Sequence, residues 1–161
     1  MELKTNVLRI LEKNKIAYRS YLYESGGAIS GKEVAQAIGK PCGQVYKTLV
    51  TAGKSKKNYV FVIPVCAELD LKKAAAAAGE KSVDMLPQKD LLPFTGYVHG
   101  GCSPIGMKKP FPTFLHITAK EQDTILFSAG KIGVQVELSP ESLEKIIRFT
   151  YADLITEEET I

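Results

Sequence analysis

The apolar residues of the first forty positions follow helical and strand spacings in turn. They recur every three or four residues near the amino end, at Leu3, Val7, Ile10 and Leu11, which predicts an amphipathic helix near 3–14. The β-rich run 18–23 predicts a strand. The segment Ser30-Gly-Lys-Glu33 has the pattern of a capping box, so it predicts a second helix, which Gly39 ends.

The rest of the chain continues to mix the two patterns. Two β-rich runs, Val45–Thr51 and Tyr59–Val65, flank a glycine-containing turn and predict a β-hairpin. Asp70 then caps an alanine-rich helix near 71–78. Further strands are expected near 95–99, 113–118, 124–128 and 132–137, and a last helix near 140–148. Because helices and strands do not alternate strictly, the pattern indicates a single α+β domain over residues 1–161, with a mixed, largely antiparallel β-sheet.

The chain is long enough to bury its own core, with 161 residues of which 45% are hydrophobic. A chain of this length hides roughly 70% of its unfolded surface and needs neither a disulfide nor a structural metal. Its three cysteines, Cys42, Cys66 and Cys102, form no C-x-x-C pair, which favours a reducing, cytoplasmic location. The longest apolar run, 59–67, is far shorter than the ~20 residues that span a bilayer, so no membrane segment is expected.

The distribution of charge is more informative than the net charge of +3. The stretches 34–67 and 91–120 contain no acidic residue, and their lysines are Lys40, Lys47, Lys54, Lys56, Lys57, Lys108, Lys109 and Lys120. The segment from Glu137 to the end is acidic instead. If the two acid-free stretches meet in space, they form a positive surface that suits phosphates, and otherwise their lysines are simply solvated.

Two short motifs point to cofactor chemistry, and neither is complete. The segment 26–33 nearly matches the phosphate-binding loop G-x-x-x-x-G-K-[ST], but Glu33 occupies the position of the hydroxyl residue that would hold Mg²⁺. His99 and Cys102 lie three residues apart, whereas a zinc site needs three or four ligands and the other cysteines and His116 show no metal spacing. We therefore expect no cofactor and no metal, with Cys102 as a buried residue.

Two further segments have alternative interpretations. The loop Gly100-Gly101-Cys102-Ser103-Pro104 can turn tightly and point backbone N–H groups inward, as in nests that hold a phosphate or an oxyanion, but also as in ordinary turns. Lys47 interrupts an apolar strand and shares a face with Val45 and Leu49. Its side chain therefore either reaches solvent at an edge or points into a cleft.

Segments from nearly the whole chain match one known family in order and spacing. They are Tyr23, Gly31–Gly39, Tyr46-Lys47-Thr48-Leu49, Leu71–Ala75, Gly96-Tyr97, Gly100-Gly101-x-Ser103-Pro104-x-Gly106-x-Lys108-Lys109 and Val136–Pro140. Together they resemble the YbaK/EbsC family, the free-standing relatives of the editing domain of prolyl-tRNA synthetase. Members of that family hydrolyse wrongly charged aminoacyl-tRNA, and the YbaK branch removes cysteine from tRNA(Pro).

The resemblance implies a barrel-like mixed sheet wrapped by helices, with a pocket between the strand of Lys47 and the glycine loop. It implies catalytic roles for Lys47, Gly100 and Gly101, and substrate contacts from Tyr23, Thr48, Ser103 and Pro104. The charge pattern adds lysines that would contact tRNA phosphates, namely Lys54, Lys56, Lys57, Lys108 and Lys109. The sequence departs from the family at Ala129, where a glycine is common, and no role is assigned to that residue.

A mechanism follows from the resemblance and from the residues that are missing. Backbone N–H groups near Gly100 and Gly101 would stabilise the oxyanion, and Lys47 would hold the terminal nucleotide or the developing charge. No protein general base is evident, so the thiol of a cysteinyl ester could attack its own carbonyl and leave as a cyclic thiolactone, as in a lyase. The expected partners are aminoacyl-tRNA, in particular tRNA(Pro), and prolyl-tRNA synthetase. A deacylase of alanyl-tRNA or another small aminoacyl-tRNA, and a non-catalytic module that binds tRNA or a synthetase, remain as alternatives.

Overall fold

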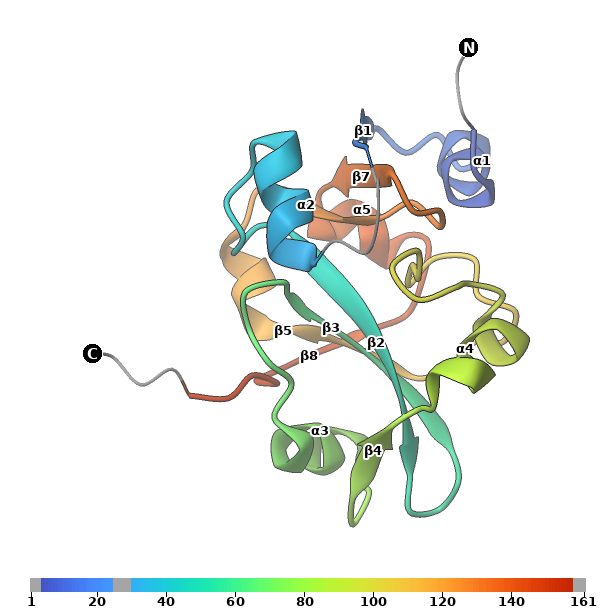
Figure 1. Cartoon of the computed structure of the whole chain (residues 1–161), viewed down its shortest axis with the longest axis vertical. Helices are drawn as coiled ribbons and strands as arrows, with labels where there is room; N and C mark the ends of the chain where they lie inside the picture. Colours follow the sequence, from blue (N-terminus) through green and yellow to red (C-terminus); the bar gives the residue numbers. More distant parts are fainter. Residues whose placement is uncertain (1–3, 25–29, 158–161) are drawn as a thin grey trace.

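The computed structural model describes residues 4–24 and 30–157 (Figure 1). Its helices are α1 (Asn6–Lys13), α2 (Gly31–Ile38), α3 (Leu71–Ala78), α4 (Gln88–Thr95), the 3₁₀ helix η1 (Ile117–Glu121) and α5 (Pro140–Glu144). Its strands are β1 (Arg19–Leu22), β2 (Tyr46–Gly53), β3 (Asn58–Pro64), β4 (Val83–Met85), β5 (Thr113–His116), β6 (Ile125–Ser128), β7 (Val134–Leu138) and β8 (Thr150–Ala152). Within the described ranges, none of the helices is long and apolar enough to cross a membrane.

The strands form two sheets. One is antiparallel with the order β1-β7-β6, and the other has the order β4-β2-β3-β5-β8, in which β5 pairs in parallel with both β3 and β8. A single parallel bridge between Val45 and Leu126 links the two sheets. The α+β class and the mixed, largely antiparallel pairing are confirmed, whereas the described strands form two joined sheets and not a closed barrel.

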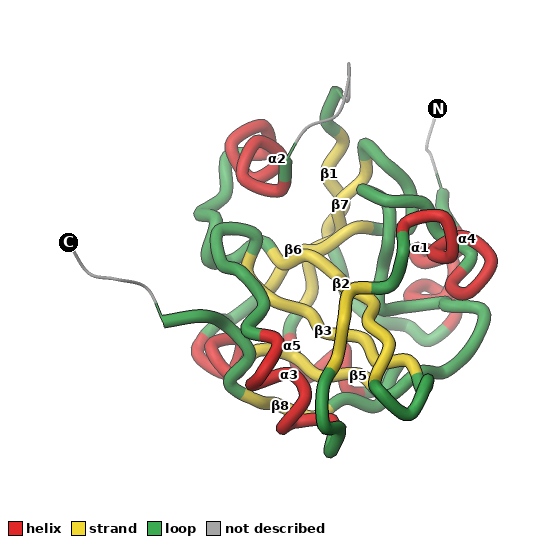
Figure 2. Tube along the Cα trace, turned by 60° about the horizontal axis from the view of Figure 1, so that its bottom comes forward, coloured by secondary structure: helices red, strands yellow, loops and turns green. Residues whose placement is uncertain are grey.

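Helices surround the two sheets (Figure 2), and apolar clusters lie against both faces of β3. The largest apolar cluster joins α1 to the inner faces of both sheets and includes Leu11, Val60, Phe127 and Val136. A second cluster lies under α3 and includes Phe61, Ile63 and Ala74. Alternate residues of β3 thus enter different clusters, which explains why its sequence is apolar throughout.

The predicted boundaries of α2 and α3 are confirmed, whereas α1 begins at Asn6, later than the predicted start near residue 3. Ser30 and Glu33 form both hydrogen bonds of the capping box at the start of α2. Asp70 accepts hydrogen bonds from two backbone N–H groups at the start of α3. Gly39 and Gly79, at the ends of these helices, adopt the left-handed conformation that glycine favours. The β-hairpin is also confirmed, because β2 and β3 pair antiparallel from Tyr46–Pro64 to Ala52–Asn58.

The strand predicted near 95–99 is wrong. That region follows α4, which ends at Gly96 with φ of 87°, although Pro93 lies inside the helix. The helix was not predicted because prolines usually end helices. Near its end, the Thr95 hydroxyl donates a hydrogen bond to the Leu91 carbonyl at 2.7 Å. The strand predicted near 113–118 ends at His116, and the last helix ends at Glu144, four residues earlier than expected.

A buried carboxylate ties the antiparallel sheet to the loop after α2. Glu137 of β7 accepts hydrogen bonds from the hydroxyls of Tyr21 and Thr124, the latter at 2.5 Å, and lies 3.7 Å from Lys40. Burial alone would raise the pKa of Glu137, but these hydroxyls, Lys40 and Arg19 outweigh it and lower the pKa below 4.5. The network therefore favours the ionised carboxylate and fixes α2 against the sheet.

We predict that Glu137→Gln lowers the free energy of unfolding at pH 7 by about 1–3 kcal/mol, because the hydroxyls lose a charged acceptor. A lowered carboxyl pKa stabilises the fold above pH 4.5, and this stabilisation is lost as pH falls through the folded-state pKa. The difference between wild type and variant should therefore shrink in acid. Urea titrations between pH 3 and pH 7 measure it, and a difference that does not depend on pH would contradict this account.

Candidate active site

A pocket opens where the outer edge of β2 is uncovered. This edge, which faces away from β3, pairs with β4 only at Thr51–Gly53 and meets β6 at the Val45 bridge. The residues between them, Tyr46–Leu49, line a pocket of about 320 Å³. This volume is near the lower end of the range for small-molecule sites, about 300–1,000 Å³.

Helix α2 forms one wall of the pocket through Ser30, Gly31 and Val34. A Cβ atom on Gly31 would lie 2.6 Å from the Val65 side chain, so only glycine allows the helix to start this close to the end of β3. The capping box fixes the same turn. The start of α2 thus has little freedom to move away from β2.

The glycine loop forms the opposite wall, with His99, Gly100 and Cys102 at the pocket. Gly100 has φ of 86°, and a Cβ atom on Gly101 would lie 3.1 Å from the backbone nitrogen of Ile132. Both glycines are therefore needed for the loop to pack against the turn between β6 and β7. The Gly101 N–H donates to the Val98 carbonyl at 3.0 Å, whereas the Gly100 N–H has no acceptor among the described residues.

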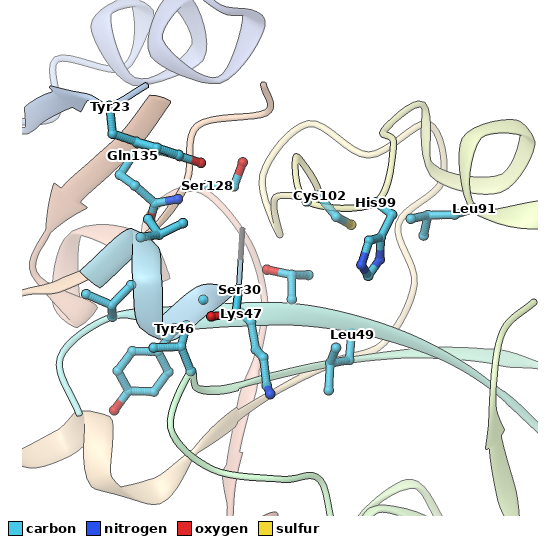
Figure 3. A pocket seen from close by; sticks show the side chains of 16 residues that line it. Tyr23, Ser30, Tyr46, Lys47, Leu49, Leu91, His99, Cys102, Ser128 and Gln135 are labelled. Atoms are coloured by element: carbon cyan, nitrogen blue, oxygen red, sulfur yellow. The ribbon is translucent and has the colours of Figure 1, made fainter. Parts of the chain in front are cut away.

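Lys47 lies on β2 at the pocket and is half-buried. Burial lowers the pKa of its ammonium group, and the negative charge of Glu68 opposes that shift. No carboxylate of the described residues forms an ion pair with it. Lys47 and Leu49 point to one side of the strand, while His99 and Cys102 lie on the other (Figure 3). The lysine is therefore a cation beside the pocket that no carboxylate of residues 4–24 and 30–157 pairs with.

Two buried polar atoms at the pocket have no hydrogen-bond partner among the described residues. They are the hydroxyl oxygen of Thr48 on β2 and the side-chain carbonyl oxygen of Gln135 on β7. An unsatisfied buried polar group costs about 1–3 kcal/mol. Such atoms are retained in a fold where a ligand or water supplies the missing bond.

The pocket does not contain an activated cysteine. Burial raises the pKa of the Cys102 thiol to about 12, so the thiolate that would attack a carbonyl is scarce at neutral pH. The second histidine lies elsewhere, since His116 accepts a hydrogen bond from the Leu154 N–H at 3.1 Å. Among the described residues no group of three or more His, Cys, Asp and Glu side chains could hold a metal ion.

The structure brings together some of the residues that the sequence singled out. Tyr23, Lys47, Thr48 and Gly100 line the pocket. Ser103 does not, because it is fully buried behind the loop and its hydroxyl accepts from the Ile105 N–H. Pro104 and Lys109 line a separate cavity of about 470 Å³. Part of the near match to a phosphate-binding loop, residues 26–29, lies outside the described residues.

The lysines at the hairpin turn are exposed but not isolated from acidic residues. Lys54, Lys56 and Lys57 lie at the tip of the hairpin, roughly 24 Å along β2 from Lys47 at 3.4 Å per residue. Glu80 folds onto this tip, where it accepts hydrogen bonds from Ser55 and Tyr59. The hairpin tip, which lacks acidic residues in sequence, therefore has Glu80 as an acidic neighbour in space.

Sequence reasoning missed three residues that line the pocket, namely Gln135, Ser128 and His99. The first two lie opposite each other on β7 and β6, where a polar residue in an apolar strand is the available signal. His99 was considered as a zinc ligand, and nothing in the sequence placed it at this pocket. Packing of distant segments creates this part of the site.

Comparisons with known proteins agree with this geometry. The model of the aminoacyl-tRNA editing domain family matches residues 27–146. EbsC of Enterococcus faecalis, a candidate Cys-tRNA(Pro)/Cys-tRNA(Cys) deacylase, is 46% identical over 156 residues, covering 96% of this chain and 95% of EbsC. A crystal structure of a candidate trans-editing enzyme for prolyl-tRNA synthetase has the same fold, with a TM-score of 0.82 at 24% identity over 96% of this chain and 100% of that one. A scaffold from a study of computational epitope grafting matches with a TM-score of 0.82 and 26% identity, covering 97% and 100%.

We predict that Cys102 in the folded protein reacts with iodoacetamide at pH 8 at least about 100-fold more slowly than in the unfolded chain. The reason is that burial raises its pKa to about 12 and removes the reactive thiolate. Mass spectrometry of alkylated peptides with and without urea gives the rates, and the half-buried Cys42 is the internal control. Rapid alkylation of Cys102 in the native protein would show that its thiol is accessible and ionised.

Proposed function

Because the chain belongs to the aminoacyl-tRNA editing domain family, we propose that it is a free-standing deacylase that removes cysteine from mischarged Cys-tRNA(Pro). The observation that carries the proposal is the pocket itself, which combines an unpaired cation with a free backbone N–H and contains no carboxylate among its described lining residues. EbsC, at 46% identity, supports cysteine as the amino acid.

The reaction needs placement more than it needs a strong catalyst, because an aminoacyl ester is already activated. The free N–H of Gly100 can donate to the oxygen that becomes negative as the carbonyl carbon turns tetrahedral. Lys47 can bind a phosphate or hydroxyl of the terminal adenosine, or the same developing charge, as a point cation. Holding the ester between these groups lowers the entropic part of the barrier.

The substrate supplies the nucleophile in this proposal. The cysteinyl thiolate attacks its own carbonyl carbon, the new C–S bond closes a four-membered ring, and the ester C–O bond to the ribose breaks. The ribose oxygen takes up a proton, and the released thiolactone is later hydrolysed by water. The buried, protonated Cys102 thiol supports a reaction that needs no protein cysteine.

The tRNA would lie across the face that carries the hairpin tip and the glycine loop. Exposed lysines at both places, Lys54, Lys56 and Lys57 at the tip and Lys108 and Lys109 after the loop, can neutralise phosphates. We propose tRNA(Pro) as the preferred tRNA and prolyl-tRNA synthetase as a further partner, because the relatives are associated with both in their names.

We predict that Lys47→Ala lowers kcat/KM for Cys-tRNA(Pro) by at least about 100-fold, since it removes a charge that acts on the transition state. Circular dichroism should show an intact fold, because the half-buried lysine forms no ion pair among the described residues. Lys13→Ala on the exposed face of α1 is the matched control. Full turnover by a folded Lys47→Ala protein would remove this lysine from the site.

We predict that replacing all three cysteines by serine leaves the deacylation rate within about threefold, provided that the variant folds. Seryl-tRNA(Pro) and alanyl-tRNA(Pro) should be much poorer substrates, because a thiol is a few per cent thiolate at neutral pH and a hydroxyl is not ionised. The measurement is the deacylation rate of cysteinyl-, seryl- and alanyl-tRNA(Pro), each with the wild type and with the triple variant. Rapid alanyl hydrolysis would indicate attack by water and exclude the thiol.

We predict that the affinity for tRNA falls as salt is raised, because each neutralised phosphate releases counterions. Reversing one tip lysine, as in Lys56→Glu, should reduce the slope of log Kd against log salt by about 1. Lys145→Glu, in the acidic carboxyl-terminal part, is the control. The measurement is the Kd for tRNA at several salt concentrations. A slope that the tip substitution leaves unchanged would exclude the hairpin tip from the tRNA-binding surface.

A further inference from the structure

Gln135 and Glu137 face the same side of β7, but among the described residues only Glu137 has hydrogen-bond partners for its side-chain oxygens. Glu137 is bonded by Tyr21 and Thr124 and lies near Lys40. Gln135 is 5% exposed, and its carbonyl oxygen has no partner in the described part of the chain. A leucine or methionine side chain would fill the same space without burying a polar atom, so the carbonyl oxygen, which no described residue satisfies, can accept a hydrogen bond from a ligand.

The chemistry of this atom restricts what the ligand offers. The hydroxyl of Thr48, the other unpartnered atom at the pocket, can donate or accept, whereas a side-chain carbonyl oxygen can only accept. Gln135 therefore requires an N–H or O–H donor. The lining includes no described carboxylate that would compete for such a donor.

The position of Gln135 selects among the donors of an aminoacyl ester. The lining residues Ser30, His99 and Gly100 are exposed, whereas Gln135 and Ser128 are buried. Figure 3 shows Gln135 grouped with Tyr23 and Ser128, away from His99. In the proposed deacylase the nucleotide would lie at the exposed lining residues, and the aminoacyl group would reach inward. The only strong donor on that group is the α-amino nitrogen.

We infer that Gln135 is a substrate-positioning residue whose carbonyl oxygen accepts a hydrogen bond from the α-amino group of the aminoacyl ester, an inference that rests on the proposed deacylase function. This bond would fix rotation about the bond between the α-carbon and the carbonyl carbon, and so direct the side-chain thiol toward the carbonyl. A pocket built in this way distinguishes α-amino esters from acyl groups that lack the nitrogen.

The test removes the nitrogen from the substrate and the amide from the protein. Wild type, Gln135→Leu and the control Gln36→Leu, at an exposed position of α2, are each given cysteinyl-tRNA(Pro) and 3-mercaptopropionyl-tRNA(Pro). The second ester keeps the thiol and lacks the amino group. Every kcat/KM is divided by the spontaneous hydrolysis rate of the same ester, and the binding of both charged tRNAs is measured in parallel.

We expect wild type and Gln36→Leu to prefer the cysteinyl ester by at least about 10-fold, and Gln135→Leu to treat the two esters within about twofold. A merely structural role would lower both rates equally and keep the preference. No preference in wild type, or a preserved preference in Gln135→Leu, would overturn the inference. If neither ester is hydrolysed, the proposed function fails, and the binding preference of wild type and variant still decides the role of Gln135.

Discussion

The whole site depends on one gap in backbone pairing along β2. The strand is anchored to β4 at Thr51–Gly53 and to β6 at Val45, and between them its outer edge is uncovered. An uncovered edge inside a fold exposes backbone groups and both faces of the strand at once. Lys47 and Thr48, which point to opposite faces, can therefore serve a single pocket.

The walls of this gap are held by contacts that leave little freedom. Gly31 brings α2 against Val65, and the Glu137 network fixes the loop that follows that helix. Gly101 brings the glycine loop against Ile132. Close packing of these walls holds the Thr48 hydroxyl and the Gln135 carbonyl in place, although no described residue satisfies either atom. The pocket is thus prepared for a polar ligand before one arrives.

Local signals explain what the sequence could predict. Capping at Ser30 and Asp70, left-handed glycines after two helices and the hairpin of β2 and β3 depend on neighbouring residues, and all are found. The short strand β8 and its parallel pairing with β5 depend on contacts across some 35 residues and leave no periodic pattern in three positions. Prolines concealed α4 because their usual effect is to end helices.

The same distinction between local signals and long-range contacts applies to the residues of the site. Lys47 was evident as a charge in an apolar strand, and the glycines as a loop that needs their conformations. Gln135 was not, because it alternates with valines on β7 as Glu137 does, and it becomes informative only when its missing hydrogen bond is seen. Likewise, Glu80 approaches the hairpin tip only through the packing of α3 and β4. Residues whose role depends on what surrounds them need the structure.

The most direct test of a thiol-driven deacylase is the identity of the first product released from Cys-tRNA(Pro). The purified chain would be mixed with the charged tRNA, quenched with acid within one turnover and analysed directly by mass spectrometry, in which the thiolactone is lighter than free cysteine by one water. The account predicts that cysteine thiolactone appears at the rate at which tRNA loses its amino acid, and before free cysteine. Free cysteine formed at that rate without any thiolactone, or tRNA that stays charged, would contradict it.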